Sequence, residues 1–177
     1  YFDIYKSFPF LNTFMIFPIL MRPRSIGRLK LRNKNPFSKP LLYHNYLTDF
    51  QDVYFLVEGI KRAIRLTETE AFQKYGVQLY RKPIAPCKHI EFGSDAYWEC
   101  CIRYMTFTFY HPAGTCKMGH YFDPDAVVDP SLRVRGIRNL RVIDASIMPH
   151  VPAAHLVGPT YLIAEKGASM VRSYWGK

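Results

Sequence analysis

Two histidines in the second half of the sequence lie where predicted secondary structure begins or ends, and this constrains the fold. Apolar and polar residues alternate over 106–110, which predicts a short, half-buried strand. The strand stops at His111, because Pro112 has no backbone N–H to donate to a sheet. His155 precedes a helix predicted over 159–175, with a proline at its first position. Free N–H groups and the helix dipole favour an anion at such a helix start.

A second short strand is predicted over 140–143, between the two histidines. It delivers Asp144 at its carboxyl end, which is the usual ligand position in open α/β sheets. The helix over 159–175 carries small residues on its surface that allow a sheet or a ligand to come close. These small residues are Ala164, Gly167 and Ala168.

The first part of the sequence predicts an antiparallel sheet followed by helices. We expect a buried strand over 14–21, a polar-faced strand over 28–32 and a third strand over 41–46, and short turns between successive strands favour antiparallel pairing. A capping box at 48–51 then begins a helix. The apolar residues on one face of that helix are Phe50, Val53, Tyr54, Val57, Ile60 and Ile64.

Two further helices complete the prediction for this part. A short helix is expected over 68–75 and ends at Gly76. Ser94 is expected to cap another helix, which carries Trp98 and Cys101. Strands and helices in this order predict an α+β fold. With 49% hydrophobic and 16% aromatic residues, the 177-residue sequence is not that of a disordered chain.

The net charge of +10 is concentrated near the beginning of the sequence. No acidic residue lies between Asp3 and Asp49. This stretch is either an anion-binding or nucleic-acid-binding patch, or the charged outer face of a strand. The alternation of basic residues with Leu29 and Leu31 favours the strand face, and we predict no nucleic-acid partner. The basic residues of the stretch are Lys6, Arg22, Arg24, Arg28, Lys30, Arg32, Lys34 and Lys39.

Three of the four cysteines raise the question of a disulfide. Neighbouring residues of a helix point about 100° apart, so Cys100 and Cys101 cannot both face the same partner. In an oxidising compartment Cys87 can pair with either of them, and the sequence leaves both pairings open.

Neither a metal site nor a membrane span is predicted. His111, Cys116 and His120 are suitable ligands for zinc, but they lack a fourth ligand at a suitable spacing. The apolar segment over 8–21 is too short to span a bilayer and is interrupted by prolines.

Several separated motifs occur in a specific order along the sequence. They are His111–Cys116 (HPAGTC), Val128–Val134 (VDPSLRV), Leu140–Pro149 (LRVIDASIMP) and Pro159–Thr160, preceded by Met21–Leu31 (MRPRSIGRLKL) and Phe92–Cys101 (FGSDAYWECC). In this order they resemble the C-terminal part of the glucose-methanol-choline (GMC) family of flavin oxidoreductases. The upstream motifs are similar to the insect glucose-dehydrogenase-like and ecdysone-oxidase-like branch, and the resemblance covers nearly all of the chain.

The resemblance implies two domains. Residues 1–126 would form an antiparallel-sheet substrate domain with flanking helices, and residues 127–177 a strand, loop and helix that complete the FAD-binding domain. Enzymes of the family are much longer and begin with a glycine-rich dinucleotide-binding unit, whereas no two of the ten glycines here are two residues apart. We therefore expect the chain, which begins at Tyr1 without an initiator Met, to be the C-terminal part of a longer protein and inactive alone.

The resemblance also implies a function, the FAD-dependent oxidation of a CH–OH group by hydride transfer to the flavin. Histidine titrates near neutrality and suits a general base. By resemblance His111 is that base, and His155 hydrogen-bonds the substrate oxygen. The residues implied to contact FAD are Asp144, Ala145, His155, Leu156 and Thr160.

The sequence departs from the insect branch at His155, where insect members usually carry Asn and the glucose-oxidase type carries His. This departure leaves the choice of substrate and acceptor open: by resemblance the substrate is a small-molecule alcohol, either a sugar or a steroid alcohol, and the electron acceptor is oxygen or a quinone. Apolar Val151, Leu156 and Val157 favour a steroid alcohol. The resemblance implies an extracellular or secretory-pathway location. The alternatives are an inactive or truncated fragment, a lyase on the same fold, or a module that binds an anion or a partner through segment 22–39.

Overall fold

The computed structural model describes residues 12–176, which form two compact units. The first unit consists of residues 12–20 and 46–108, and the second of residues 21–45 and 109–176. The predicted division at residue 126 concerns the domains of an intact enzyme and stays a prediction.

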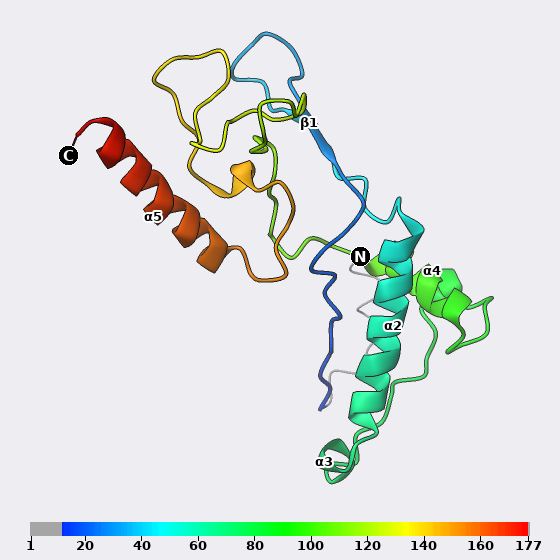
Figure 1. Ribbon diagram of the computed structural model, residues 1–177. Coiled ribbons are helices and arrows are strands. Elements are labelled where there is room, and N and C mark those ends of the chain that lie inside the picture. Colours follow the sequence, from blue (N-terminus) through cyan, green and yellow to red (C-terminus); the bar gives the residue numbers. More distant parts are fainter. Residues whose placement is uncertain (1–11, 177) are drawn as a thin grey trace. The chain divides into compact units, whose positions relative to one another are not determined.

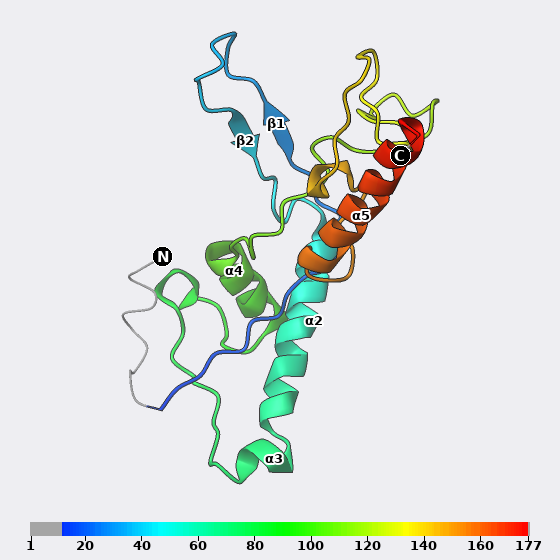
Figure 2. The ribbon, with the colours of Figure 1, turned by 90° about the vertical axis from the view of Figure 1, so that its left-hand side faces the viewer.

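The first unit is helical. Helix α2 (Phe50–Thr67) lies beside helix α4 (Asp95–Met105), as both views show (Figures 1 and 2). A short helix, α3 (Glu70–Gln73), follows α2, and a 3-10 turn, η1 (Ala85–Cys87), packs on α4. Helix α3 is shorter than the predicted 68–75, and the chain turns at Gly76 with a positive φ of 64°.

Side-chain caps fix where the two long helices begin. The Ser94 hydroxyl accepts a hydrogen bond from the N–H of Tyr97 at 3.1 Å, which confirms the predicted cap of α4. At α2 the cap is Asp49, whose Oδ1 accepts from the N–H of Gln51 at 2.8 Å. The predicted capping box placed the start of this helix one residue too early.

Two small clusters of buried side chains hold the first unit together. One joins Val53 and Val57 of α2 to Ile102 of α4. Phe50 and Tyr54, which were predicted to share the buried face of α2, are exposed. The second cluster consists of Ile84, Cys87, Tyr97 and Cys101.

A disulfide closes the second cluster. It joins Cys87 to Cys100, with 6.0 Å between their Cα atoms, and this settles the pairing that the sequence left open. Cys101 is a buried free thiol. Burial raises the pKa of Tyr97 to about 12, although its hydroxyl interacts with the backbone of Ile84, and burial also raises the pKa of the Cys101 thiol.

The segment before α2 is not the buried strand predicted over 14–21. Residues 13–20 have no regular secondary structure, and their large apolar side chains are mostly half exposed. The segment is held by side chains, because Phe14 stacks on Phe72 and Phe17 lies edge-on to Phe107, each at 5.8 Å between ring centroids. Apolar composition alone predicted a strand here, but no strand of the described residues lies next to it.

In the second unit, strands β1 (Arg28–Lys30) and β2 (Leu41–Tyr43) form a two-stranded antiparallel sheet (Figure 2). The register pairs Leu29 with Leu42. Both strands fall inside the ranges predicted for them. A small antiparallel sheet with helices confirms the predicted α+β class.

The rest of the second unit is largely irregular chain around a small core of Val128, Leu132 and Ile147. Its regular elements are a 3-10 turn, η2 (Ala145–Ile147), and helix α5 (Val157–Tyr174). The strands predicted over 106–110 and 140–143 are wrong, since neither segment forms a strand. The second contributes a single bridge, between Arg141 and Arg133. The strand of the predicted C-terminal strand and helix is thus absent from the described residues, whereas the helix is present.

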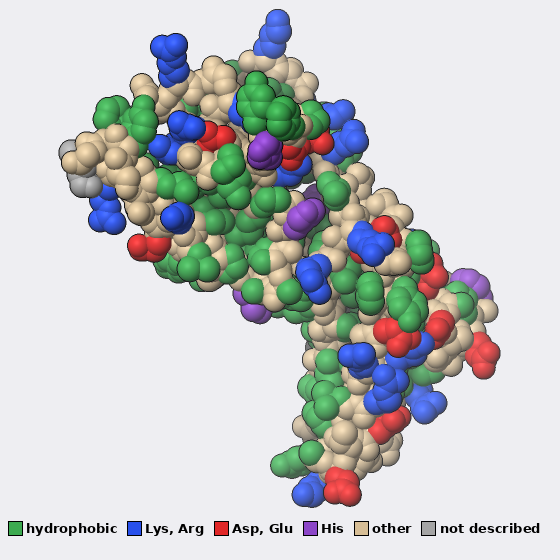
Figure 3. Space-filling model, viewed as in Figure 1, with side chains coloured by type: hydrophobic (Ala, Val, Ile, Leu, Met, Phe, Trp, Pro, Cys, Tyr) green, Lys and Arg blue, Asp and Glu red, His purple; other side chains and the backbone are tan. Residues whose placement is uncertain are grey.

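Helix α5 covers the core at a glycine. Gly167 is buried, and a side chain there would overlap Ile143. By contrast with the buried Gly167, Tyr161 and Leu162 of the same helix are 70% and 73% exposed. Exposed apolar side chains, green in Figure 3, lie in patches among the charged and other side chains on the face seen there. None of the helices within residues 12–176 is long and apolar enough to cross a membrane.

Candidate active site

The two predicted catalytic histidines lie together in the second unit. His111 Nε2 and His155 Nδ1 are 2.7 Å apart, and the ring centroids are 5.0 Å apart with the planes nearly perpendicular at 84°. The motifs assigned both histidines to one site, and the structure places the two rings in contact. Their catalytic roles stay predictions.

The contact has a simple chemical meaning. Only one hydrogen can lie between two nitrogens at 2.7 Å, so one imidazole donates and the other accepts. The remaining nitrogens, His111 Nδ1 and His155 Nε2, have no hydrogen-bond partner among residues 12–176. The outer nitrogens of the pair therefore offer one donor and one acceptor.

Backbone hydrogen bonds, and not a strand, position His111. The chain after it runs along the turn η2, and three N–H groups in alternate residues donate to three successive carbonyls. Gly114 donates to Ala145 at 3.3 Å, and Cys116 and Met118 donate to Ser146 and Ile147, each at 2.8 Å. This ladder ties the His111 loop to the segment that leads to His155.

The residue before His111 has an unusual backbone conformation. Tyr110 has φ of 60°, in the left-handed region that few non-glycine residues occupy. Such conformations cost of order 1 kcal/mol and persist where the surroundings impose them. The bend at Tyr110 separates Phe109 from His111, and their rings still contact edge to face at 5.9 Å.

His155 is positioned by the start of helix α5. The next residue, Leu156, is buried with 7% of its surface exposed. Its carbonyl accepts from the backbone N–H of Thr160 at 2.9 Å and from the Thr160 hydroxyl at 2.6 Å. His155 itself is exposed, so a buried neighbour holds a side chain that solvent or a ligand can reach.

The other residues predicted to contact FAD have structural partners in the described chain. Asp144 caps η2, since its Oδ1 accepts from the Ser146 N–H at 2.8 Å and from the Ser146 hydroxyl at 2.5 Å. The Ala145 carbonyl belongs to the ladder described above. Contact of Asp144, Ala145, Leu156 and Thr160 with a cofactor stays a prediction.

The start of α5 has features that fit a bound cofactor. This helix has no side-chain cap, and its third residue, Pro159, has no N–H. The backbone N–H groups of Val157 and Gly158 therefore have no partner within the described chain. A Cβ built on Gly158 would meet nothing within 4 Å, so there is room beside them. Free N–H groups at a helix start suit a group that becomes negative, such as a reduced flavin ring.

One neighbour of the histidines escaped the sequence reasoning. Phe109 was assigned only to one face of a predicted strand, yet its ring lies 5.9 Å from each imidazole centroid. Its spacing of two residues from His111 was the one available signal. The contact with His155, 46 residues away, had none.

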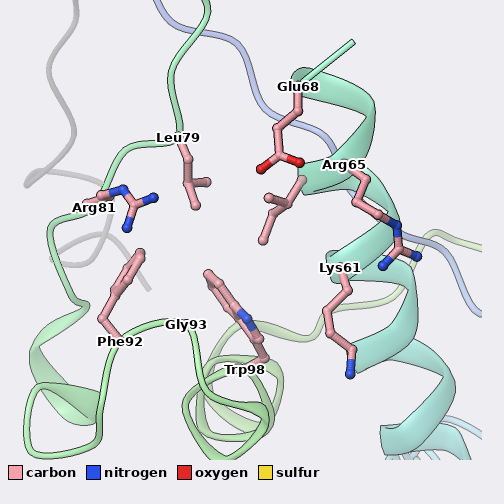
Figure 4. Close-up of a pocket in the computed structure, with 9 residues that line it drawn as sticks. Lys61, Arg65, Glu68, Leu79, Arg81, Phe92, Gly93 and Trp98 are labelled. Atoms are coloured by element: carbon pink, nitrogen blue, oxygen red, sulfur yellow. The ribbon is translucent and has the colours of Figure 1, made fainter.

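Metal-binding clusters and cavities are the other kinds of candidate site. Among the described residues, no group of three His, Cys, Asp or Glu side chains could hold a metal ion. A cavity of about 300 Å³ in the first unit is lined by none of the predicted site residues (Figure 4). Arg81 and Trp98 extend toward its centre in that view. The full lining is Lys61, Ile64, Arg65, Glu68, Leu79, Arg81, Phe92, Gly93 and Trp98.

Comparison with known proteins gives the same family as the motifs. Residues 23–164 match the model described as GMC oxidoreductase. The chain is 48% identical over 165 residues to glucose dehydrogenase (FAD, quinone) of Drosophila melanogaster, and 41% identical over 161 residues to mitochondrial choline dehydrogenase of Homo sapiens. These alignments cover 93% and 89% of the chain and 26% of each relative. The chain thus spans about a quarter of the length of these curated relatives.

Solved structures agree. A fungal aryl-alcohol oxidase superimposes with a TM-score of 0.76 at 28% identity, covering 89% of this chain and 25% of the oxidase. A variant of Aspergillus oryzae formate oxidase, studied for its FAD modification, superimposes with a TM-score of 0.75 at 30% identity, covering 88% of this chain and 26% of the oxidase. With a family model matching most of its length, the chain belongs to the GMC oxidoreductase family.

Proposed function

We propose that this chain supplies the proton-handling part of an FAD-dependent enzyme that oxidises a CH–OH group. The observation that carries the proposal is the 2.7 Å contact between His111 Nε2 and His155 Nδ1. Because the chain spans a quarter of its relatives, the proposal concerns an enzyme in which it forms the C-terminal quarter. The relatives' names support the cofactor and the reaction class.

An alcohol needs two functions from the protein as it becomes a carbonyl. One group takes the hydroxyl proton, and another hydrogen-bonds the oxygen while negative charge develops on it. A hydroxyl bound beside the pair would meet one accepting nitrogen and one donating N–H, because the hydrogen between the rings leaves one outer nitrogen bare and the other protonated. We assign the acceptor to His111 and the donor to His155, because the ladder holds the His111 loop more firmly than the exposed His155.

FAD, when bound, accepts the hydride that leaves the carbinol carbon, a reaction that no protein side chain can perform. The residues that would hold it are Asp144, Ala145, His155, Leu156 and Thr160, with the free N–H groups of Val157 and Gly158 at the start of α5. We further propose a sugar or steroid alcohol as substrate and oxygen or a quinone as final acceptor. The name of the Drosophila relative includes quinone, which favours that acceptor.

The test is anaerobic flavin reduction in the complete enzyme, followed by absorbance with glucose and with a hydroxysteroid. His111→Ala should slow reduction by roughly 10²–10⁴-fold, the usual contribution of a positioned base. His155→Asn should be milder, because the amide still donates a hydrogen bond to the oxygen. His150 is an exposed histidine five residues before His155, so His150→Ala is the matched control and should stay within about threefold, or roughly 0.7 kcal/mol of barrier.

Two results would contradict the proposal. One is a purified complete enzyme that contains no flavin. The other is a His111→Ala variant that is reduced as fast as His150→Ala by every alcohol that reduces the unmodified enzyme.

We also propose an extracellular or secretory-pathway location. The Cys87–Cys100 disulfide supports it, since such bonds persist in oxidising compartments. Peptide mapping of enzyme from its native tissue tests this proposal, because a fully reduced pair in undamaged enzyme would contradict it.

A further inference from the structure

Phe109 completes a cluster of three rings with the two histidines. The ring centroids form a triangle with sides of 5.9, 5.9 and 5.0 Å, the shortest joining the two imidazoles. Phe109 is perpendicular to His111 at 87° and tilted by 44° to His155. Edge-to-face and tilted arrangements at these distances are the favourable ones for aromatic pairs. One side chain therefore touches both members of the pair.

Few other groups restrain the two imidazoles. Within the described residues, neither makes a side-chain hydrogen bond except to the other, and neither forms an ion pair. His155 is exposed and His111 only half-buried, so surrounding side chains do not enclose them. An imidazole rotates about two side-chain torsions, and the second of these is broad. The Phe109 ring contacts both imidazoles and thus restrains both.

The backbone conformation between Phe109 and His111 positions the Phe109 ring. The left-handed conformation of Tyr110, with φ of 60°, lies between Phe109 and His111, and Pro112 fixes φ on the other side. This rigid turn keeps the Phe109 ring against His111. Because the same ring reaches His155, it joins the two ends of the site.

We infer that Phe109 is a positioning residue that holds the His111–His155 pair at hydrogen-bonding distance, an inference that rests on the proposed function. It acts through the imidazoles, and replacing it should affect the rate of the chemical step more than substrate binding. A displacement of about 1 Å in reacting groups can lower a rate by roughly 10²-fold.

The test compares two phenylalanines of the complete enzyme. Phe109 and Phe107 are 45% and 46% exposed, but Phe107 packs on Phe17 and on neither histidine. Phe109→Leu should lower the rate of flavin reduction by about 10- to 100-fold with less than about threefold change in KM. Phe107→Leu should leave the rate within about threefold. Phe109→Tyr restores the ring and should recover most of the rate.

A second readout does not depend on activity. In a crystal structure of the Phe109→Leu enzyme prepared without flavin, the distance between His111 Nε2 and His155 Nδ1 should exceed about 3.5 Å, the limit of a hydrogen bond. In the Phe107→Leu enzyme it should remain near the 2.7 Å seen here.

The outcomes separate this inference from the proposed function. If His111→Ala has no effect, the proposed function fails, and the crystallographic distance still tests whether Phe109 holds the pair. Suppose that the His111→Ala enzyme is reduced slowly, while the Phe109→Leu and Phe107→Leu enzymes have the same rate of flavin reduction and the same distance between the two histidines. The proposed function then stands, and the role of Phe109 is overturned. Failure of Phe109→Tyr to recover the rate would also overturn it.

Discussion

Gly167 of α5 lies directly against Ile143, with no room for a side chain between them. Ile143 precedes the cap of η2, and the start of the same helix α5 follows His155. This close approach joins helix α5, which follows His155, to the chain that leads into η2 in the second unit.

A side chain at Gly167 should destabilise the protein. Gly167→Leu forces Ile143 or the helix to move, and overpacking of this kind typically costs about 1–3 kcal/mol. Gly158→Ala is the matched control in the same helix, because nothing lies within 4 Å of its added methyl group. The control should be neutral or stabilising by up to about 1 kcal/mol. Urea denaturation measures both changes, and equal destabilisation by the two variants would contradict the packing argument.

Asp129 should contribute to the acid sensitivity of the protein. Burial tends to raise its pKa, but hydrogen bonds from Arg133 and Ser131 outweigh this and hold the pKa below its ordinary 3.8. The ionised group is therefore favoured by folding. Its contribution is complete well above the unfolded pKa of about 4 and is lost as the pH falls through the lower folded value.

The matching experiment replaces the carboxylate by an amide. Asp129→Asn should lower the free energy of unfolding at pH 7 by about 1–2 kcal/mol, with the difference from the unmodified protein shrinking below about pH 4. Asp125→Asn is the control, because no hydrogen bond to its carboxylate lies within residues 12–176. A constant difference from pH 7 to pH 3 would show that the stabilisation does not come from ionisation.

The disulfide should contribute measurably to the stability of the first unit. Cys87 and Cys100 are 13 residues apart, and closing a loop of this size stabilises by roughly 3 kcal/mol in the chain-entropy account. Cys100→Ser should lower the urea midpoint in non-reducing buffer, and a reductant should lower the midpoint of the unmodified protein to a similar value. A variant with an unchanged midpoint would mean that the clusters around Val57 and Tyr97 suffice alone.

The two free thiols should differ in reactivity. Burial raises the pKa of Cys101, an effect that a hydrogen bond with Tyr97 only partly offsets, so its reactive thiolate is scarce near pH 8. Cys116 is half-buried. With iodoacetamide at pH 8, Cys116 should be labelled in the folded protein and Cys101 only after denaturation. Mass spectrometry locates the label, and rapid labelling of folded Cys101 would contradict its place in the core.

Local signals predicted the helices and the hairpin well. The Ser94 cap, the turn at Gly76 and the alternation around Leu29 depend on neighbours in sequence, and all three were found. The strands expected over 14–21 and 106–110 were not, because a strand exists only when another strand pairs with it. Apolar alternation describes which faces can be buried, and it carries no information about that partner.

The site shows the same limit. The motifs singled out His111 and His155, and the prolines placed them next to the ends of predicted elements. The cap made by Asp144, the ladder along η2 and the approach of Phe109 to His155 all depend on tertiary contacts. No periodicity in the sequence reports contacts between residues this far apart.

The ladder between the His111 loop and η2 has a consequence for engineering. Its three hydrogen bonds connect the backbone of residues 114–118 to that of 145–147, so the two segments are complementary in shape whatever their side chains are. A chimaera that imports only one of them from a related oxidoreductase combines two backbones that were not selected together. Both segments therefore need to be transplanted together, as a single cassette.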